Sequence, residues 1–143
     1  MVFFIYINTI IFLALAFLHV YWALGGKRAS TAALPSKPGA GPVFIPSRVG
    51  TLVIAVGLFL FAGITISNSG FFNPPVSSKY IRYATFGIAI IFLLRAIGDF
   101  KYVGLTKGIK NTAFARKDNS VFTPLCIVLT LFSFLIAVSS QLR

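Results

Sequence analysis

Four long apolar runs divide this sequence, and they constrain its fold more than any other feature. The runs cover residues 2–24, 49–67, 80–97 and 122–141. Each reaches the roughly 17–25 residues that a helix needs to cross the hydrocarbon core of a bilayer. Strands are excluded because the runs lack alternating polarity and because a membrane barrel needs about eight strands or more. The sequence therefore predicts an all-α membrane protein, with residues 1–143 forming a single domain of four transmembrane helices.

The charge is strongly one-sided. Thirteen Lys and Arg face only two acidic residues, and charged residues make up 10% of the chain, against about 25% in ordinary soluble domains. The bases lie beside membrane-length runs, and no nucleic-acid-binding motif accompanies them. We therefore expect anionic lipid headgroups as partners, and no nucleic acid.

The distribution of the bases predicts the orientation. The first run has no Lys or Arg before it, which favours an uncleaved membrane anchor over a signal peptide. Basic loops stay in the cytoplasm, so both termini are predicted to lie outside. Nine of the thirteen bases fall in the first and third gaps: Lys27, Arg28, Lys37, Arg48, Lys101, Lys107, Lys110, Arg116 and Lys117.

A faint repeat relates the two halves of the chain. The sequence Ala23-Leu24-Gly25-Gly26 resembles Ala96-Ile97-Gly98-Asp99, at an offset of 73 residues. The same offset carries the start of the second run to that of the fourth. Two hairpins of the same orientation would be related by an axis along the membrane normal. Chance similarity between apolar helix ends is the alternative.

Two further local patterns predict helix boundaries. Leu105, Ile109 and Ala113 recur at helical spacing among lysines, which indicates a short helix at the membrane surface. Thr123 and Pro124 are typical of an N-cap and of the first position of a helix, here the fourth span.

Ionisable side chains inside membrane spans are the main candidates for a functional site. Arg95 lies near the inner end of the third run, and Asp99 follows four residues later. On one helix these two would share a face and pair. The pair is then either an intrahelical cap with Arg95 reaching the surface, or a clamp in which Asp99 orients Arg95 toward a phosphate or carboxylate.

The single histidine is the second candidate. His19 lies about 8 Å inside the inner end of the first run, and Trp22 at i+3 shares its face. The two residues are either part of an aromatic belt or a ligand-binding or proton-carrying group beside a cavity. With the predicted topology, His19, Arg95, Asp99 and Asp118 all lie at the cytoplasmic end.

Several familiar chemistries have no support in the sequence. Cys126 is the only cysteine and is expected to be a small buried apolar residue. One histidine and two acids do not make a convincing metal site. No nucleotide-binding or hydrolase motif occurs. We expect no metal and no cofactor.

Five motifs carry a resemblance to a known family: His19-x-x-Trp22-Ala23-x-Gly25-Gly26, Leu34-Pro35, the block from Leu94 to Gly104, Phe114-Ala115-x-x-Asp118 and Thr123-Pro124-Leu125-Cys126. Together they resemble a family of small bacterial four-span membrane proteins of unknown function (domain of unknown function 3995). The resemblance covers nearly the whole chain. It implies a bacterial inner-membrane protein, supports considering His19, Trp22, Arg95, Asp99 and Asp118 together, and brings no activity.

Three function classes follow. The favoured one is a non-catalytic accessory or structural component of a membrane complex, with other subunits or a second copy as partner, because Gly50, Gly57 and Gly63 suit close helix packing. The second is a binder or carrier of a lipophilic anion or lipid at the cytoplasmic-side polar site. The third is a small membrane enzyme acting on a lipid-like substrate, with His19 and an Asp as an acid–base pair.

Overall fold

The structure, a computed structural model, describes residues 1–28, 30–71 and 75–140. In this part of the chain four helices are long and apolar enough to cross a membrane: α1 (Val2–Ala23), α2 (Arg48–Ser67), α3 (Ser78–Ile97) and a helix over Ala113–Ser139. The last consists of α4 (Ala113–Lys117), a π turn (Asp118–Phe122) and α5 (Thr123–Ser139). The described residues contain no strand, so the predicted all-α membrane fold with four spans is confirmed. Gln141, the predicted end of the fourth span, lies outside the described residues.

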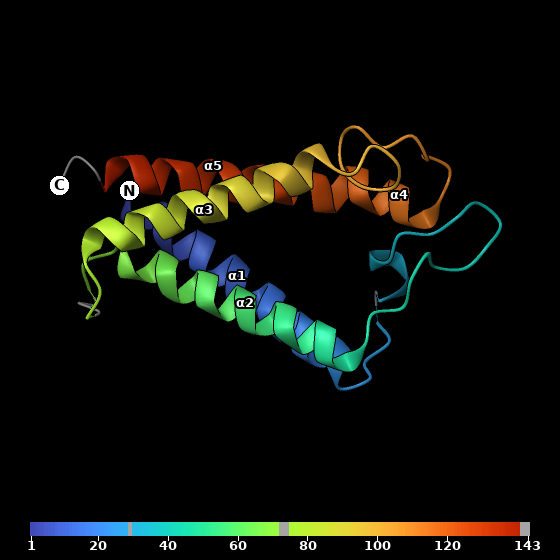
Figure 1. Cartoon of the computed structure of the whole chain (residues 1–143), viewed down its shortest axis with the longest axis horizontal. Coiled ribbons are helices and arrows are strands. Elements are labelled where there is room, and N and C mark those ends of the chain that lie inside the picture. Colours follow the sequence, from blue (N-terminus) through green and yellow to red (C-terminus); the bar gives the residue numbers. More distant parts are fainter. Residues whose placement is uncertain (29, 72–74, 141–143) are drawn as a thin grey trace.

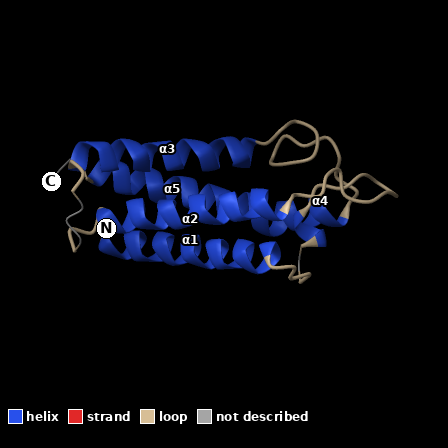
Figure 2. Ribbon diagram, turned by 60° about the horizontal axis from the view of Figure 1, so that its bottom comes forward, coloured by secondary structure: helices blue, strands red, loops and turns tan. Residues whose placement is uncertain are grey.

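The helices form two hairpins. α1 packs mainly on α2, and α3 packs mainly on α5. In Figure 1, α1 and α3 run in one direction while α2 and α5 return in the other. Any chain of four successive spans alternates in this way, so the internal repeat stays a prediction. Figure 2 shows α4 and the loops after α1 and α3 gathered at one end of the bundle, which we call the loop end.

The core lies where the two hairpins meet. Phe12, Leu58, Ile88 and Leu129, one from each long helix, are all buried there. Between α1 and α5, the Asn8 side chain donates to Ser133 Oγ over 3.0 Å. The outward faces carry large exposed apolar side chains, as lipid-facing helices require. The protein is therefore a multi-pass membrane protein, and which end faces the cytoplasm stays a prediction.

The predicted surface helix in the third loop is wrong. Leu105 and Ile109 lie in an irregular segment, and helix begins only at Ala113. Gly98 (φ 96°) and Gly104 (φ 82°) adopt left-handed conformations just before this segment. The backbone N–H groups of Leu105 and Thr106 therefore bond back to the end of α3 and do not start a new helix. The helix that follows is capped by Thr112, whose side chain accepts from the backbone N–H of Ala115 over 3.0 Å.

The predicted cap at Thr123 is also wrong. Thr123 has helical dihedrals (φ −65°, ψ −48°) and lies inside the continuous helix. Pro124 is tolerated there because the preceding turn, Asp118–Phe122, is a π turn. A proline lacks the N–H for the usual bond and clashes with the carbonyl four residues earlier, and the wider turn relieves both problems.

Candidate functional site

A buried carboxylate organises the loop end. Asp118 lies in the π turn and is fully buried. Its Oδ1 accepts from Arg95 Nη2 over 3.0 Å. Its Oδ2 accepts from Lys107 Nζ and from the Gly104 backbone N–H, each over 2.8 Å. Asp118 therefore joins α3, the loop 98–112 and the fourth helix at one point.

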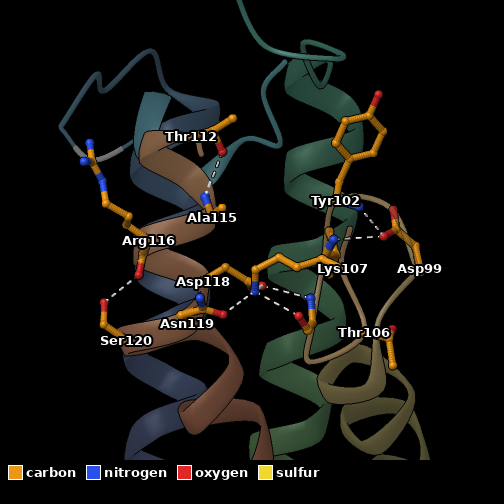
Figure 3. Close-up of polar contacts among 12 residues, drawn as sticks. Asp99, Tyr102, Thr106, Lys107, Thr112, Ala115, Arg116, Asp118, Asn119 and Ser120 are labelled. Carbon is orange, nitrogen blue, oxygen red and sulfur yellow. Dashed lines mark hydrogen bonds and ion pairs between the residues drawn. The ribbon is translucent and has the colours of Figure 1, made fainter. Parts of the chain in front are cut away.

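Lys107 is the other buried charge. Its side chain is 1% exposed, and Figure 3 shows it extended toward Asp118 and Asn119. The ammonium donates to the Gly104 carbonyl over 2.9 Å, to Asp118 and to the Asn119 side chain. These three acceptors satisfy its three donors. We call Arg95, Lys107, Asp118 and Asn119 the polar node.

The loop 98–112 folds back over the end of α3 and so brings Lys107 to Asp118. The backbone N–H groups of Leu105 and Thr106 donate to the carbonyls of Ala96 and Ile97 over 2.9 and 3.1 Å. These carbonyls would otherwise lack partners at the helix end. The turn depends on glycine, because a Cβ at Gly98 would overlap the Val103 carbonyl.

The predicted pair between Arg95 and Asp99 is wrong. α3 ends at Ile97, so Asp99 is not on the helix and Arg95 pairs with Asp118 instead. Asp99 Oδ1 accepts the backbone N–H groups of Lys101, Tyr102 and Val103 over 3.0, 2.7 and 2.8 Å. Partial burial by itself would raise the pKa of Asp99, but these donors hold it below its usual value. Asp99 stabilises a tight loop.

A cavity of about 900 Å³ lies beside the polar node, between the two hairpins at the loop end. His19 and Trp22 line it from α1, Arg95 lines it from the end of α3, and Asp99 and Tyr102 line it from the following loop. Most of the remaining lining is apolar. Four of the five candidate residues from the sequence line this cavity: His19, Trp22, Arg95 and Asp99. The fifth, Asp118, does not line it but is paired with Arg95.

The polar groups on the cavity wall are held in place. His19 Nδ1 lies 2.7 Å from the Leu15 carbonyl oxygen. Because a carbonyl only accepts, Nδ1 is the donor in this hydrogen bond, and Nε2 is the ring nitrogen that the bond does not use. Trp22 Nε1 donates to the Arg28 carbonyl over 2.8 Å, and its ring meets that of His19 edge to face at 5.1 Å. Arg95 is different: its Nη2 is paired, whereas its Nη1 is buried without a partner among the described residues.

Sequence reasoning missed Lys107 and Asn119. Lys107 was one base among five in a basic gap, and nothing in its spacing marked it as buried. Its role depends on how the loop folds. As for metals, no three His, Cys, Asp or Glu side chains in the described residues lie close enough to hold an ion. Cys126, the single cysteine of the sequence, is buried on α5, as expected.

Fold and site together define a small four-span membrane protein with a buried polar node and a mostly apolar cavity at one end of the bundle. The chain belongs to the DUF3995 family, proteins of unknown function, whose family model matches residues 12–133. The resemblance noted in the sequence is thereby confirmed. No curated protein and no solved structure matches the chain.

Proposed function

We propose that this protein binds an amphipathic anion in the cavity between its hairpins, with Arg95 as the group that holds the negative charge. The proposal rests on the hydrogen bonding of the Arg95 guanidinium. One guanidinium nitrogen is paired with Asp118, while the other is buried, has no partner among the described residues, and belongs to a residue lining the cavity.

Charge supports an anion at this position. The node contains two cations, Arg95 and Lys107, and one carboxylate, Asp118. Lys107 is fully satisfied by oxygen acceptors, so the excess positive charge of the node falls on Arg95, whose side chain is 33% exposed. The other acidic residue, Asp99, lines the cavity and has its Oδ1 engaged by three backbone N–H donors. A buried donor without an acceptor costs free energy, and a phosphate or carboxylate oxygen would remove that cost.

The rest of the cavity suits hydrocarbon. Leu34, Val43, Phe44, Ile54 and Phe114 contribute apolar wall. Such a site with one fixed cation fits a lipophilic anion better than a hydrophilic one.

Arg95→Gln tests the proposal. Arg82→Gln is the matched control, because Arg82 lies near the other end of α3 and is remote from the cavity lining. Both variants are purified in native-like lipid discs, and bound lipids are counted by mass spectrometry. We expect Arg95→Gln to lose co-purifying anionic lipid and Arg82→Gln to keep it. Equal retention by two folded variants means that Arg95 is only structural.

An accessory or structural role in a membrane complex is the second candidate. It is favoured by the open space at Gly57 and Gly63, where an added Cβ would meet no neighbour. Those surfaces would allow a partner helix, from another subunit or a second copy, to approach closely. A partner that co-purifies at fixed stoichiometry, and is lost in Gly57→Leu, would favour this role over ligand binding.

We do not extend the proposal to catalysis. His19 and Asp99 line the same cavity, but Asp99 Oδ1 is occupied by three backbone donors. Its lowered pKa keeps Asp99 ionised near neutrality and makes it a poor proton donor.

We also propose that the protein resides in the bacterial inner membrane with its loop end in the cytoplasm. The two basic gaps support this orientation by the positive-inside rule. A fluorescent protein that matures only in the cytoplasm, fused to the C-terminus, should remain dark. A fluorescent fusion would mean that the C-terminus lies in the cytoplasm and that the orientation is the opposite of the proposed one.

A further inference from the structure

The boundary between α2 and α3 is hollow at both ends. At the loop end it opens into the cavity beside Arg95. At the opposite end lies a second, almost entirely apolar groove of about 580 Å³, with Leu60 and Gly63 on α2 and Tyr80 and Ala84 on α3 among its walls. We call this second space the outer groove.

One face of α2 runs from the cavity toward the outer groove. Ile54, Gly57, Phe61 and Ile64 follow one another at three- and four-residue spacing and therefore share a face. Phe61 packs against Phe92 of α3, with ring centroids 6.2 Å apart. This face of α2 consequently meets α3.

A face of α3 next to the one that carries Phe92 has the same spacing. Tyr80, Ala84, Gly87, Ile91 and Leu94 recur every three or four residues, from the outer groove to the cavity. Gly87 on α3 and Gly57 on α2 both have open space where a Cβ would stand. At these two glycines the surface is low on both helices, beside the contact between Phe61 and Phe92.

The cavity is open sideways at this boundary. Ile54 and Leu94 both line it, yet they are 50% and 61% exposed. In a membrane-spanning bundle, the exposed parts of such side chains face hydrocarbon. An apolar chain bound at the loop end can therefore leave the cavity between these two residues without crossing water.

We propose that the ligand is a long-chain anionic amphiphile of the bilayer, whose head lies at Arg95 and whose hydrocarbon chain passes between Ile54 and Leu94 into the outer groove. This inference rests on the proposed anion site and adds the class of ligand and its route. From Ile54 to Gly63 the path along α2 is about 14 Å, at 1.5 Å per residue. A short-chain anion would fill only the cavity, and a long-chain one would reach both hollows.

The test compares hexadecyl phosphate with octyl phosphate, binding to the full chain in maltoside micelles. Trp22 is the only tryptophan and lines the cavity, so its emission reports occupancy. Gly63→Leu and Ala84→Leu narrow the outer groove from its two walls. Ala14→Leu makes a comparable change on the exposed face of α1, far in sequence from both walls.

We expect each groove variant to weaken hexadecyl phosphate binding by about tenfold and to leave octyl phosphate binding unchanged. Ala14→Leu should change neither. If the groove variants leave both ligands unaffected while Arg95→Gln weakens both, the chain route is wrong and the anion site stands. If Arg95→Gln weakens neither, the proposed function itself fails.

Two other occupants of the groove have distinct signatures. Hexadecyl maltoside binding as tightly as hexadecyl phosphate would mean that the groove takes any lipid chain, which overturns the inference. A change in oligomeric state on Gly63→Leu, measured by light scattering, would mean that a second copy fills the groove, with the same consequence.

Discussion

Lys107 Nζ lies 2.8 Å from Asp118 Oδ2, and neither side chain has appreciable contact with solvent. The two residues join a loop to the fourth helix across 11 positions of sequence. Because Asp118 also binds Arg95, a single carboxylate determines both the path of the loop 98–112 and the position of the cation on the cavity wall. The structural node and the proposed ligand site are therefore coupled.

Removal of Asp118 should be the most destabilising single change in the node. Asp118→Ala leaves Lys107 without its counter-ion in a buried position, and breaking a buried pair in this way costs about 3–5 kcal/mol. Lys107→Met should cost less, because Asp118 keeps Arg95 and the Gly104 N–H. Unfolding of both variants in mixed micelles, followed by circular dichroism, measures the difference. Equal stabilities of the two variants would mean that, once Lys107 is removed, Arg95 does not stabilise the buried negative charge of Asp118.

The turn at Gly98 should not accept alanine. Gly98→Ala places a Cβ against the Val103 carbonyl in a left-handed backbone, so we expect a loss well above the roughly 1–2 kcal/mol of the conformation alone. Gly39→Ala is the control, because Gly39 is also left-handed (φ 68°) but has open space around it. Melting temperatures should fall much further for Gly98→Ala. Similar decreases in melting temperature for both variants would mean that the left-handed backbone, and not the contact with Val103, causes the loss of stability.

Acid should loosen the loop held by Asp99. Its folded pKa lies below the usual 3.8, so its stabilising contribution is complete above that pH and is lost as the pH falls through the lower, folded value. The amide NMR signals of Lys101, Tyr102 and Val103 should shift together with a midpoint below 3.8. Asp99→Asn should abolish this transition. A midpoint at or above the usual value would contradict the hydrogen bonds at Asp99.

The start of the fourth helix should depend on Thr112 and not on Thr123. Thr112→Ala removes the cap on Ala115 and should cost about 1 kcal/mol. The Thr123 hydroxyl is buried without a partner among the described residues, so Thr123→Val should be neutral or stabilising. Thermal unfolding of the two variants compares them directly. If Thr123→Val lowers the stability more than Thr112→Ala does, Thr123 caps the helix, as the sequence Thr123-Pro124 predicts.

The sequence by itself determined the class and the number of membrane-length helices. Four apolar runs of membrane length without alternating polarity predict helices, because every backbone polar group in hydrocarbon must be satisfied within its own helix. His19, Trp22, Arg95, Asp99 and Asp118 were also chosen from sequence, since ionisable groups near span ends are costly and few. Four of them line one cavity.

Only the tertiary structure decided how these groups are paired. Arg95 is bound by a residue 23 positions away instead of the one four positions away, because two left-handed glycines end α3 and turn the loop back over it. The same turn buries Lys107, which the sequence presents as one more surface base. Local spacing predicts contacts within a helix, whereas contacts through a loop depend on its path, and that path is set by packing between distant segments.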